Sequence, residues 1–166
     1  MQNTPDVVIT GVGVISPIGI GTDAFWHALL EGESGIRPID LFDANGLTVR
    51  FGGQVPSFDP KLYVRPRKSL KVMSRDIQFG FAAADLAIAD AGISSDTLDP
   101  ERFGVVFGNE MIYADLDDLE TTYRRAKTSA GTFSYKHWAE AIHEELQPLW
   151  LLKHLPNMTA SHIAIA

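Results

Sequence analysis

Apolar residues in this chain form two runs, one near the N-terminus and one shortly after a long helical pattern. The first run extends from Val7 to Ile15 and contains Gly11 and Gly13, and the second covers residues 103–108. A run that is apolar on both faces is typical of a strand buried on both faces of a sheet. The two glycines allow another backbone to approach closely, and Pro17 ends the run because it has no N–H for a ladder. We therefore expect two central strands here.

The long pattern between these runs predicts one helix over residues 67–91. Its apolar stripe consists of Met73, Ile77, Phe81, Ala84, Ile88 and Ala91. The side chains on its other faces are mostly alanine and glycine, and such small residues favour close packing on several sides. Gly92 is placed to end the helix. A helix between two apolar strands predicts a right-handed β-α-β crossover with parallel strands.

Shorter patterns predict two elements in the first third of the chain. Residues 23–31 form a helix with Thr22 as N-cap and Gly32 at its end. Its expected buried face consists of Phe25, Trp26, Leu29 and Leu30. Residues 47–55 alternate between apolar and polar and indicate a half-exposed edge strand.

The last third of the chain is predicted to be helical. Amphipathic patterns indicate helices over residues 115–127 and 135–146, and a further helix begins near Pro156 and runs to Ala166. The acidic residues at the start of the first of these complement the helix dipole, which explains them better than a metal site does. Residues 148–155 are very apolar, which indicates burial or an interface. The chain therefore predicts an α/β domain.

Composition limits the function classes. The 166 residues are 45% hydrophobic and 21% charged, which suits one globular domain or a large part of one. With no cysteine, these residues supply no disulfide, thiolate metal site or cysteine nucleophile. The net charge of −7 argues against a general nucleic-acid binder. No apolar run approaches the ~20 residues of a membrane span, and no signal-peptide pattern opens the chain, so we expect a cytosolic protein.

Motifs with a known chemistry are absent from the sequence. A dinucleotide fingerprint on Gly11 and Gly13 needs a third glycine at position 16, where the chain has Ser16 followed by Pro17. Zinc-helix, nucleophile-elbow and phosphate-loop patterns are also missing. From the residues alone, no catalytic group can be identified.

One basic cluster stands out in this acidic chain. Five cations, Arg65, Arg67, Lys68, Lys71 and Arg75, lie within eleven residues at the start of the predicted long helix. Cations at a helix N-terminus oppose the helix dipole. Two interpretations remain open from the residues alone: a solvated helix start, or a docking surface for an acidic partner.

Several segments in order resemble the N-terminal part of the β-ketoacyl-acyl carrier protein synthases, the type II-like condensing enzymes of the thiolase-like superfamily. The first group comprises residues 8–13, 17–19, Phe25-Trp26, Leu29-Leu30, Gly32, residues 34–39, Phe42-Asp43 and Phe58-Asp59-Pro60. The second comprises Arg67-Lys68, Met73, Gln78, residues 82–84, 90–92, 99–102, 104–106, Gly108 and Pro156-Asn157-Met158. Each piece is weak alone, whereas the ordered set covers nearly the whole chain.

The resemblance implies an α/β, thiolase-like fold. Residues 1–166 would be an N-terminal ketoacyl-synthase domain: an incomplete first βαβαβ half, with helical insertions, around a mixed and mostly parallel sheet. The family's nucleophilic cysteine, two histidines and lysine lie beyond the matched segments, so we expect no catalytic residue here and a chain cut before the nucleophile. The expected activity of the full-length protein is decarboxylative Claisen condensation of acyl and malonyl thioesters in fatty-acid or polyketide synthesis.

The resemblance also implies partners and sites. The partners are the acyl carrier protein, acyl and malonyl thioesters, and a second subunit in a homodimer or heterodimer; no nucleic acid, metal or cofactor is implied. Arg67, Lys68 and Lys71 match the surface that receives the carrier protein. Met111 aligns with an acyl-pocket residue near the dimer interface.

Two departures from the family pattern leave alternatives open. Glu110, Ile112 and Tyr113 replace family glycines, and Ser74 stands where the family usually has Asp. The protein could be a divergent synthase, a non-catalytic chain-length-factor-like partner subunit, or a ketosynthase paralogue with a replaced nucleophile. A thiolase proper fits less well, because the basic residues match the synthases better.

The apolar residues 149–152 and 163–166 would leave an exposed patch, so we expect residues 1–166 alone to aggregate or to bind hydrophobic dye.

Overall fold

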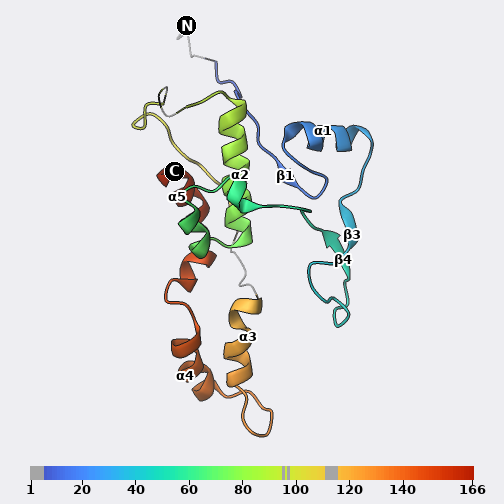
Figure 1. Ribbon diagram of the computed structural model, residues 1–166, viewed down its shortest axis with the longest axis vertical. Helices are drawn as coiled ribbons and strands as arrows, with labels where there is room; N and C mark the ends of the chain where they lie inside the picture. Colours follow the sequence, from blue (N-terminus) through green and yellow to red (C-terminus); the bar gives the residue numbers. More distant parts are fainter. Residues whose placement is uncertain (1–5, 95, 97, 111–115) are drawn as a thin grey trace.

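The computed structural model describes residues 6–94, 96, 98–110 and 116–166, and helix α2 (Arg75–Asp90) occupies its upper centre (Figure 1). Below α2, helices α3 (Leu116–Arg125) and α4 (Tyr135–Glu145) form a separate helical hairpin. The N-terminal side holds β1 (Ile15–Ser16), β2 (Gly19–Ile20), α1 (Thr22–Leu30), β3 (Ile36–Pro38) and β4 (Phe51–Gly53). The remaining elements are α5 (Met158–Ile165) and three 3₁₀ helices, η1 (Pro60–Leu62), η2 (Arg67–Val72) and η3 (Trp150–His154).

Both sheets found within the described residues are small and antiparallel. β1 pairs with β2 across a tight turn, and β3 pairs with β4 so that Ile36 lies opposite Gly53. The edge strand expected over residues 47–55 is confirmed at Phe51–Gly53. The parallel pairing predicted between the two apolar runs is not formed within the described residues.

The two apolar runs are not buried strands, and that prediction is wrong for the described residues. Neither Val7 to Val14 nor residues 103–108 form a ladder, and Val7 and Val106 are almost fully exposed. A strand obtains its ladder and its buried faces from neighbouring strands, and none of the described segments pairs with either run.

The first run lies instead along α2, where the close approach expected at its glycines is confirmed. A Cβ atom at Gly11 would lie 2.3 Å from the Ala87 carbonyl oxygen, and one at Gly13 would lie 2.0 Å from that of Ala83. Two side chains hold the backbone of Val12 between them: its N–H donates to Asp90 Oδ2 at 2.8 Å, and its carbonyl accepts from Thr22 Oγ1 at 2.9 Å.

The core lies between α2, η2 and α5. Its buried members are Val64, Met73, Ile77 and Phe81, with Leu70, Met158 and Ile163 packed against them. At Gly80 the two helices approach closely, because an added Cβ would lie 2.5 Å from Thr159 Cγ2. The apolar stripe predicted for the long helix is therefore confirmed at its N-terminal end.

The single helix predicted over residues 67–91 is wrong in one respect, because the chain breaks it at Met73. Met73 is extended (φ −110°, ψ 123°), so that η2 ends before it and α2 begins after Ser74. Ser74 is the N-cap: its Oγ accepts the Ile77 N–H at 3.3 Å, and the residue is 4% exposed. Serine and aspartate are equally good N-caps, so the serine at this position, where the resemblance leads us to expect aspartate, keeps the capping role.

The other predicted helices form, with changes in detail. α1 follows Gly21 rather than a Thr22 cap, and its expected apolar face is largely exposed, with only Ala28 buried. Gly32 has φ +67° and ends α1 as predicted. In α3 Thr122 is buried, as is Ala126 directly after the helix, while Tyr123 is 49% exposed. Every helix within the described ranges is too short or too polar to cross a membrane.

The accessible surface is large for the mass of the chain. It measures 12325 Å², whereas a folded monomer of 18.2 kDa exposes about 8,100 Å² by the usual scaling of area with mass. The exposed side chains include large apolar ones from the two unpaired runs, and Leu149 and Leu151 of the expected patch. Exposed apolar surface of this extent favours association.

We predict that residues 1–166 expressed alone bind 8-anilinonaphthalene-1-sulfonate or aggregate, because the apolar runs find no cover within the described fold. Fluorescence titration and light scattering measure this directly. A monodisperse monomer that melts cooperatively and does not raise the fluorescence of the dye would contradict this prediction.

Replacing Gly13 with alanine should lower the free energy of unfolding by about 1–3 kcal/mol, because the new methyl group would meet the backbone of α2. Chemical denaturation of the full-length protein gives the change. Gly46→Ala is the matched control, since no atom lies within 4 Å of a Cβ at that position. Equal stability of the two variants would show that this approach is not a constraint.

Candidate functional site

The basic cluster predicted from the sequence lies mainly on η2, a separate 3₁₀ helix. Pro66 precedes η2 with extended backbone, and Met73 ends it. Arg67, Lys68 and Lys71 are all exposed, and none forms an ion pair in the part of the chain that the structure describes. Residues three apart in a 3₁₀ helix share one face, so Lys68 and Lys71 point in the same direction.

Apolar contacts fix the inner side of η2 to the core. Leu70 packs against the core cluster, and η2 also contacts η3. Only Arg75 of the five cations belongs to α2 itself, so the expected conflict between several cations and the α2 dipole does not arise. The remaining cations form an exposed, uncompensated positive surface on a fixed support.

Arg75 differs from the other four cations in its surroundings. Its guanidinium lies 4.7 Å from the Phe79 ring centre and 5.9 Å from that of Phe58, and it donates to the Val55 carbonyl at 3.1 Å. These contacts attach α2 to the segment after β4. Arg75 is therefore a structural residue, and the candidate docking residues are Arg67, Lys68 and Lys71.

Met111, Ile112 and Tyr113 lie outside the described residues. The preceding residue pair is well fixed: Asn109 donates from Nδ2 to Thr159 Oγ1 at 3.2 Å, and its Oδ1 accepts the Glu110 N–H at 2.9 Å. Thr159 is fully buried at the α2–α5 contact. Sequence reasoning missed Asn109, although a polar residue directly after an apolar run is a signal for such an anchor.

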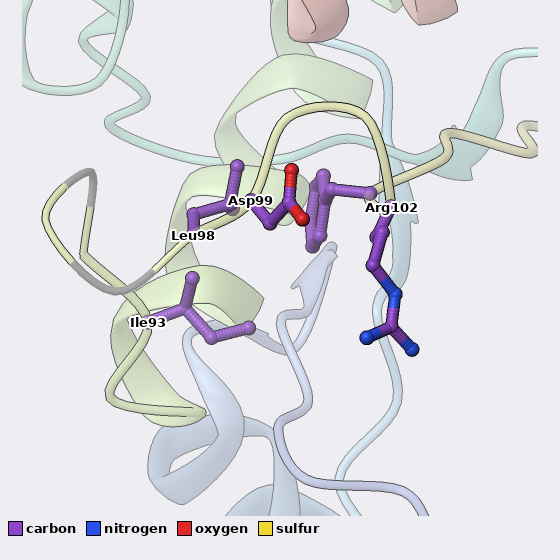
Figure 2. Close-up of a pocket in the computed structure, with 5 residues that line it drawn as sticks. Ile93, Leu98, Asp99 and Arg102 are labelled. Atoms are coloured by element: carbon purple, nitrogen blue, oxygen red, sulfur yellow. The ribbon is translucent and has the colours of Figure 1, made fainter.

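Figure 2 shows a shallow pocket at the end of α2, with a volume of about 330 Å³, lined by Ile93, Leu98, Asp99, Arg102 and Phe103. The Asp99 carboxylate accepts the Glu101 N–H at 3.1 Å, and the Arg102 guanidinium points away from it. Within this lining the Asp99 carboxylate has no second acid or base directed at it.

An apolar cleft of about 350 Å³ continues between α2 and α5. Its walls are Gly13, the small residues of α2, residues 103–107 and Ile163. Its lining contains no ionisable side chain.

Burial lowers the pKa of His162 on α5, which keeps that imidazole neutral at neutral pH. The described residues contain no cluster of acidic or histidine side chains suited to a metal ion.

The sequence matches the family described as "Beta-ketoacyl synthase, N-terminal domain" over residues 4–166. The tetracenomycin polyketide synthase ketoacyl synthase beta subunit of Streptomyces glaucescens is 41% identical over 106 residues, which are 64% of this chain and 26% of the relative. The 3-oxoacyl-[acyl-carrier-protein] synthase 2 of Vibrio harveyi is 40% identical over 110 residues, 66% of this chain and 26% of that protein. The chain thus spans about a quarter of the length of these curated relatives.

Solved structures give the fold. The ishigamide ketosynthase/chain length factor matches with a TM-score of 0.67 and 27% identity, covering 95% of this chain and 36% of the other. A type II polyketide ketosynthase solved with its acyl-carrier protein matches with a TM-score of 0.63 and 18% identity, covering 95% and 38%. These likenesses confirm the α/β, thiolase-like fold class expected from the sequence. The chain therefore belongs to the β-ketoacyl synthase family, whose N-terminal domain it matches from residue 4 to residue 166.

Proposed function

We propose that this chain serves as the N-terminal domain of a β-ketoacyl-acyl carrier protein synthase in fatty-acid or polyketide synthesis. In that reaction the malonyl thioester loses carbon dioxide, and the resulting enolate attacks the acyl thioester carbonyl and releases its thiolate. The family match over nearly the whole chain carries the proposal. We assign none of the residues 1–166 to the chemical step and no cofactor to the reaction. We propose that the protein acts in the cytosol.

The carrier protein is proposed to dock on Arg67, Lys68 and Lys71. Exposed cations without intramolecular partners attract an acidic protein over several ångströms and raise its rate of encounter. The three side chains meet this condition, and η2 is held in place by Leu70 and η3. One structural neighbour was solved in complex with its acyl-carrier protein, which supports the same partner here.

The acyl chain is proposed to reach Met111. Asn109 supports this assignment indirectly, because its contacts with Thr159 and Glu110 fix the chain directly before Met111. The bulky residues Glu110, Ile112 and Tyr113 in place of glycine favour an altered acyl preference.

A second subunit, identical or related, is part of the proposal. The accessible area of the chain exceeds that of a typical monomer of its mass, and the surplus includes exposed apolar side chains. The beta subunit of Streptomyces glaucescens and the ketosynthase/chain length factor structure support either a homodimer or a heterodimer.

A non-catalytic partner subunit is the alternative function. The replaced glycines after Asn109 and the similarity to a ketoacyl synthase beta subunit favour it. The residue at the nucleophile position of the full-length protein separates the two functions. A cysteine that is acylated by an acyl-carrier thioester, seen by mass spectrometry, supports the enzyme, whereas glutamine or another non-nucleophile supports the partner.

The double charge reversal Lys68→Glu/Lys71→Glu should weaken binding of the holo-carrier protein about tenfold, and the loss should shrink as salt screens the charges. Isothermal titration with the full-length protein at low and high salt measures it. Arg102→Glu is the matched control, because its exposed guanidinium lies outside η2. An unchanged affinity in the η2 variant would contradict the docking assignment.

A further inference from the structure

The α3–α4 hairpin carries an aromatic cluster near the turn that joins its helices. Tyr123 and Trp138 have ring centres 4.5 Å apart, and the Phe133 ring lies 5.1 Å from that of Tyr135 and 5.9 Å from that of Trp138. Three of these four rings remain open to solvent: Tyr123 is 49%, Phe133 44% and Tyr135 83% exposed. We call residues 121–139, which contain this cluster, the hairpin tip.

Other contacts already hold the hairpin together. Thr122, Ala126 and Ala141 are the buried side chains between its helices. Arg125 pairs with Glu144 at 2.6 Å and with Glu145, which raises the pKa of its guanidinium. The Tyr123–Trp138 contact adds to this junction, whereas the Tyr135 ring packs edge-on against Phe133 and stays 83% exposed, so the junction does not depend on Tyr135. Exposed, contiguous aromatic rings are typical of a surface that binds another molecule.

The charge of the hairpin tip is opposite to that of the rest of the chain. Residues 121–139 contain four lysines and arginines and no acidic residue, whereas the whole chain has 14 basic and 21 acidic side chains. Lys127 and Lys136 are exposed and form no ion pair within the described ranges. The tip therefore combines apolar rings with free positive charge.

This combination selects among possible occupants. A symmetric contact between two tips would bring like charges together, which disfavours a second copy of the chain. The two unpaired lysines are few for a nucleic acid, whose binding depends on neutralising several phosphates. An acidic, amphipathic protein helix fits both features, because its apolar face can cover the rings while its carboxylates reach the two lysines.

The hairpin is also linked to η3, the 3₁₀ helix that contacts η2. Lys153 of η3 pairs with Asp118 of α3 at 2.9 Å, and both side chains are partly buried. η3 in turn contacts η2. The hairpin tip and the η2 cations thus belong to one connected unit.

We propose that the hairpin tip is a second contact surface for the acidic carrier protein, separate from Arg67, Lys68 and Lys71. This inference rests on the proposed function. Tyr135 and Phe133 receive the apolar face of a carrier helix, and Lys127 and Lys136 receive its carboxylates.

The test measures the affinity of the full-length protein for holo-carrier protein by isothermal titration. Lys127→Glu/Lys136→Glu and Tyr135→Ser should each weaken binding at least threefold, and only the first loss should depend strongly on salt. The changed side chains are exposed, and circular dichroism with thermal melting verifies that each variant is folded. Lys61→Glu is the matched control, being an exposed lysine outside both η2 and the hairpin tip.

The outcomes separate this inference from the proposed function. If the η2 variant weakens binding and the tip variants do not, the tip proposal is overturned while carrier docking stands. If neither set changes the affinity, the carrier-docking function fails as well. Tip-dependent binding of a single-stranded oligonucleotide, or tip-dependent self-association in sedimentation, with unchanged carrier affinity would also overturn the tip proposal.

Discussion

The backbone of residues 11–13 lies so close to α2 that one added methyl group at Gly13 would sit 2.0 Å from the Ala83 carbonyl oxygen. Only the absence of a side chain on one partner and alanine on the other allows this distance. The same solution recurs at Gly80, where α2 meets Thr159 of α5. These contacts place the N-terminal segment and α5 on the same helix, and the Thr159 contact in turn anchors Asn109. The thin faces of α2 are thus what sets the positions of the surrounding segments.

The N-terminal end of α2 determines where the basic residues lie. If the helix ran unbroken from residue 67, Arg67, Lys68 and Lys71 would occupy its first turns and oppose its dipole. The extended Met73 and the Ser74 cap separate them onto η2. Met73 itself remains buried, so the break does not interrupt the core. The proposed docking surface can therefore carry several cations without opposing the dipole of the central helix.

Periodicity predicted most helices because their pattern is set by each segment's own buried face. It missed the break at Met73, because Met73, Ile77 and Phe81 keep helical spacing across it; Ser74 three residues before Ile77 was the available signal. It failed at the two apolar runs, since strand burial depends on partners that no local pattern supplies. The exposed docking candidates Arg67, Lys68 and Lys71 could be predicted from charge. The position of Asn109 directly after an apolar run was a signal for an anchor, but its partner Thr159 lies fifty residues away and no local pattern identifies it.

The two basic surfaces differ in how they can contribute to binding. η2 offers charge alone, which steers an acidic partner and is screened by salt. The hairpin tip adds exposed rings, and burying apolar area stabilises a complex at any ionic strength. Under the proposed function, a carrier that must arrive, transfer its acyl group and leave is served by charge that speeds encounter and by a modest apolar contact that fixes orientation. If both proposed surfaces bind the carrier, we expect a salt-sensitive on-rate from η2 and a salt-resistant residence time from the tip.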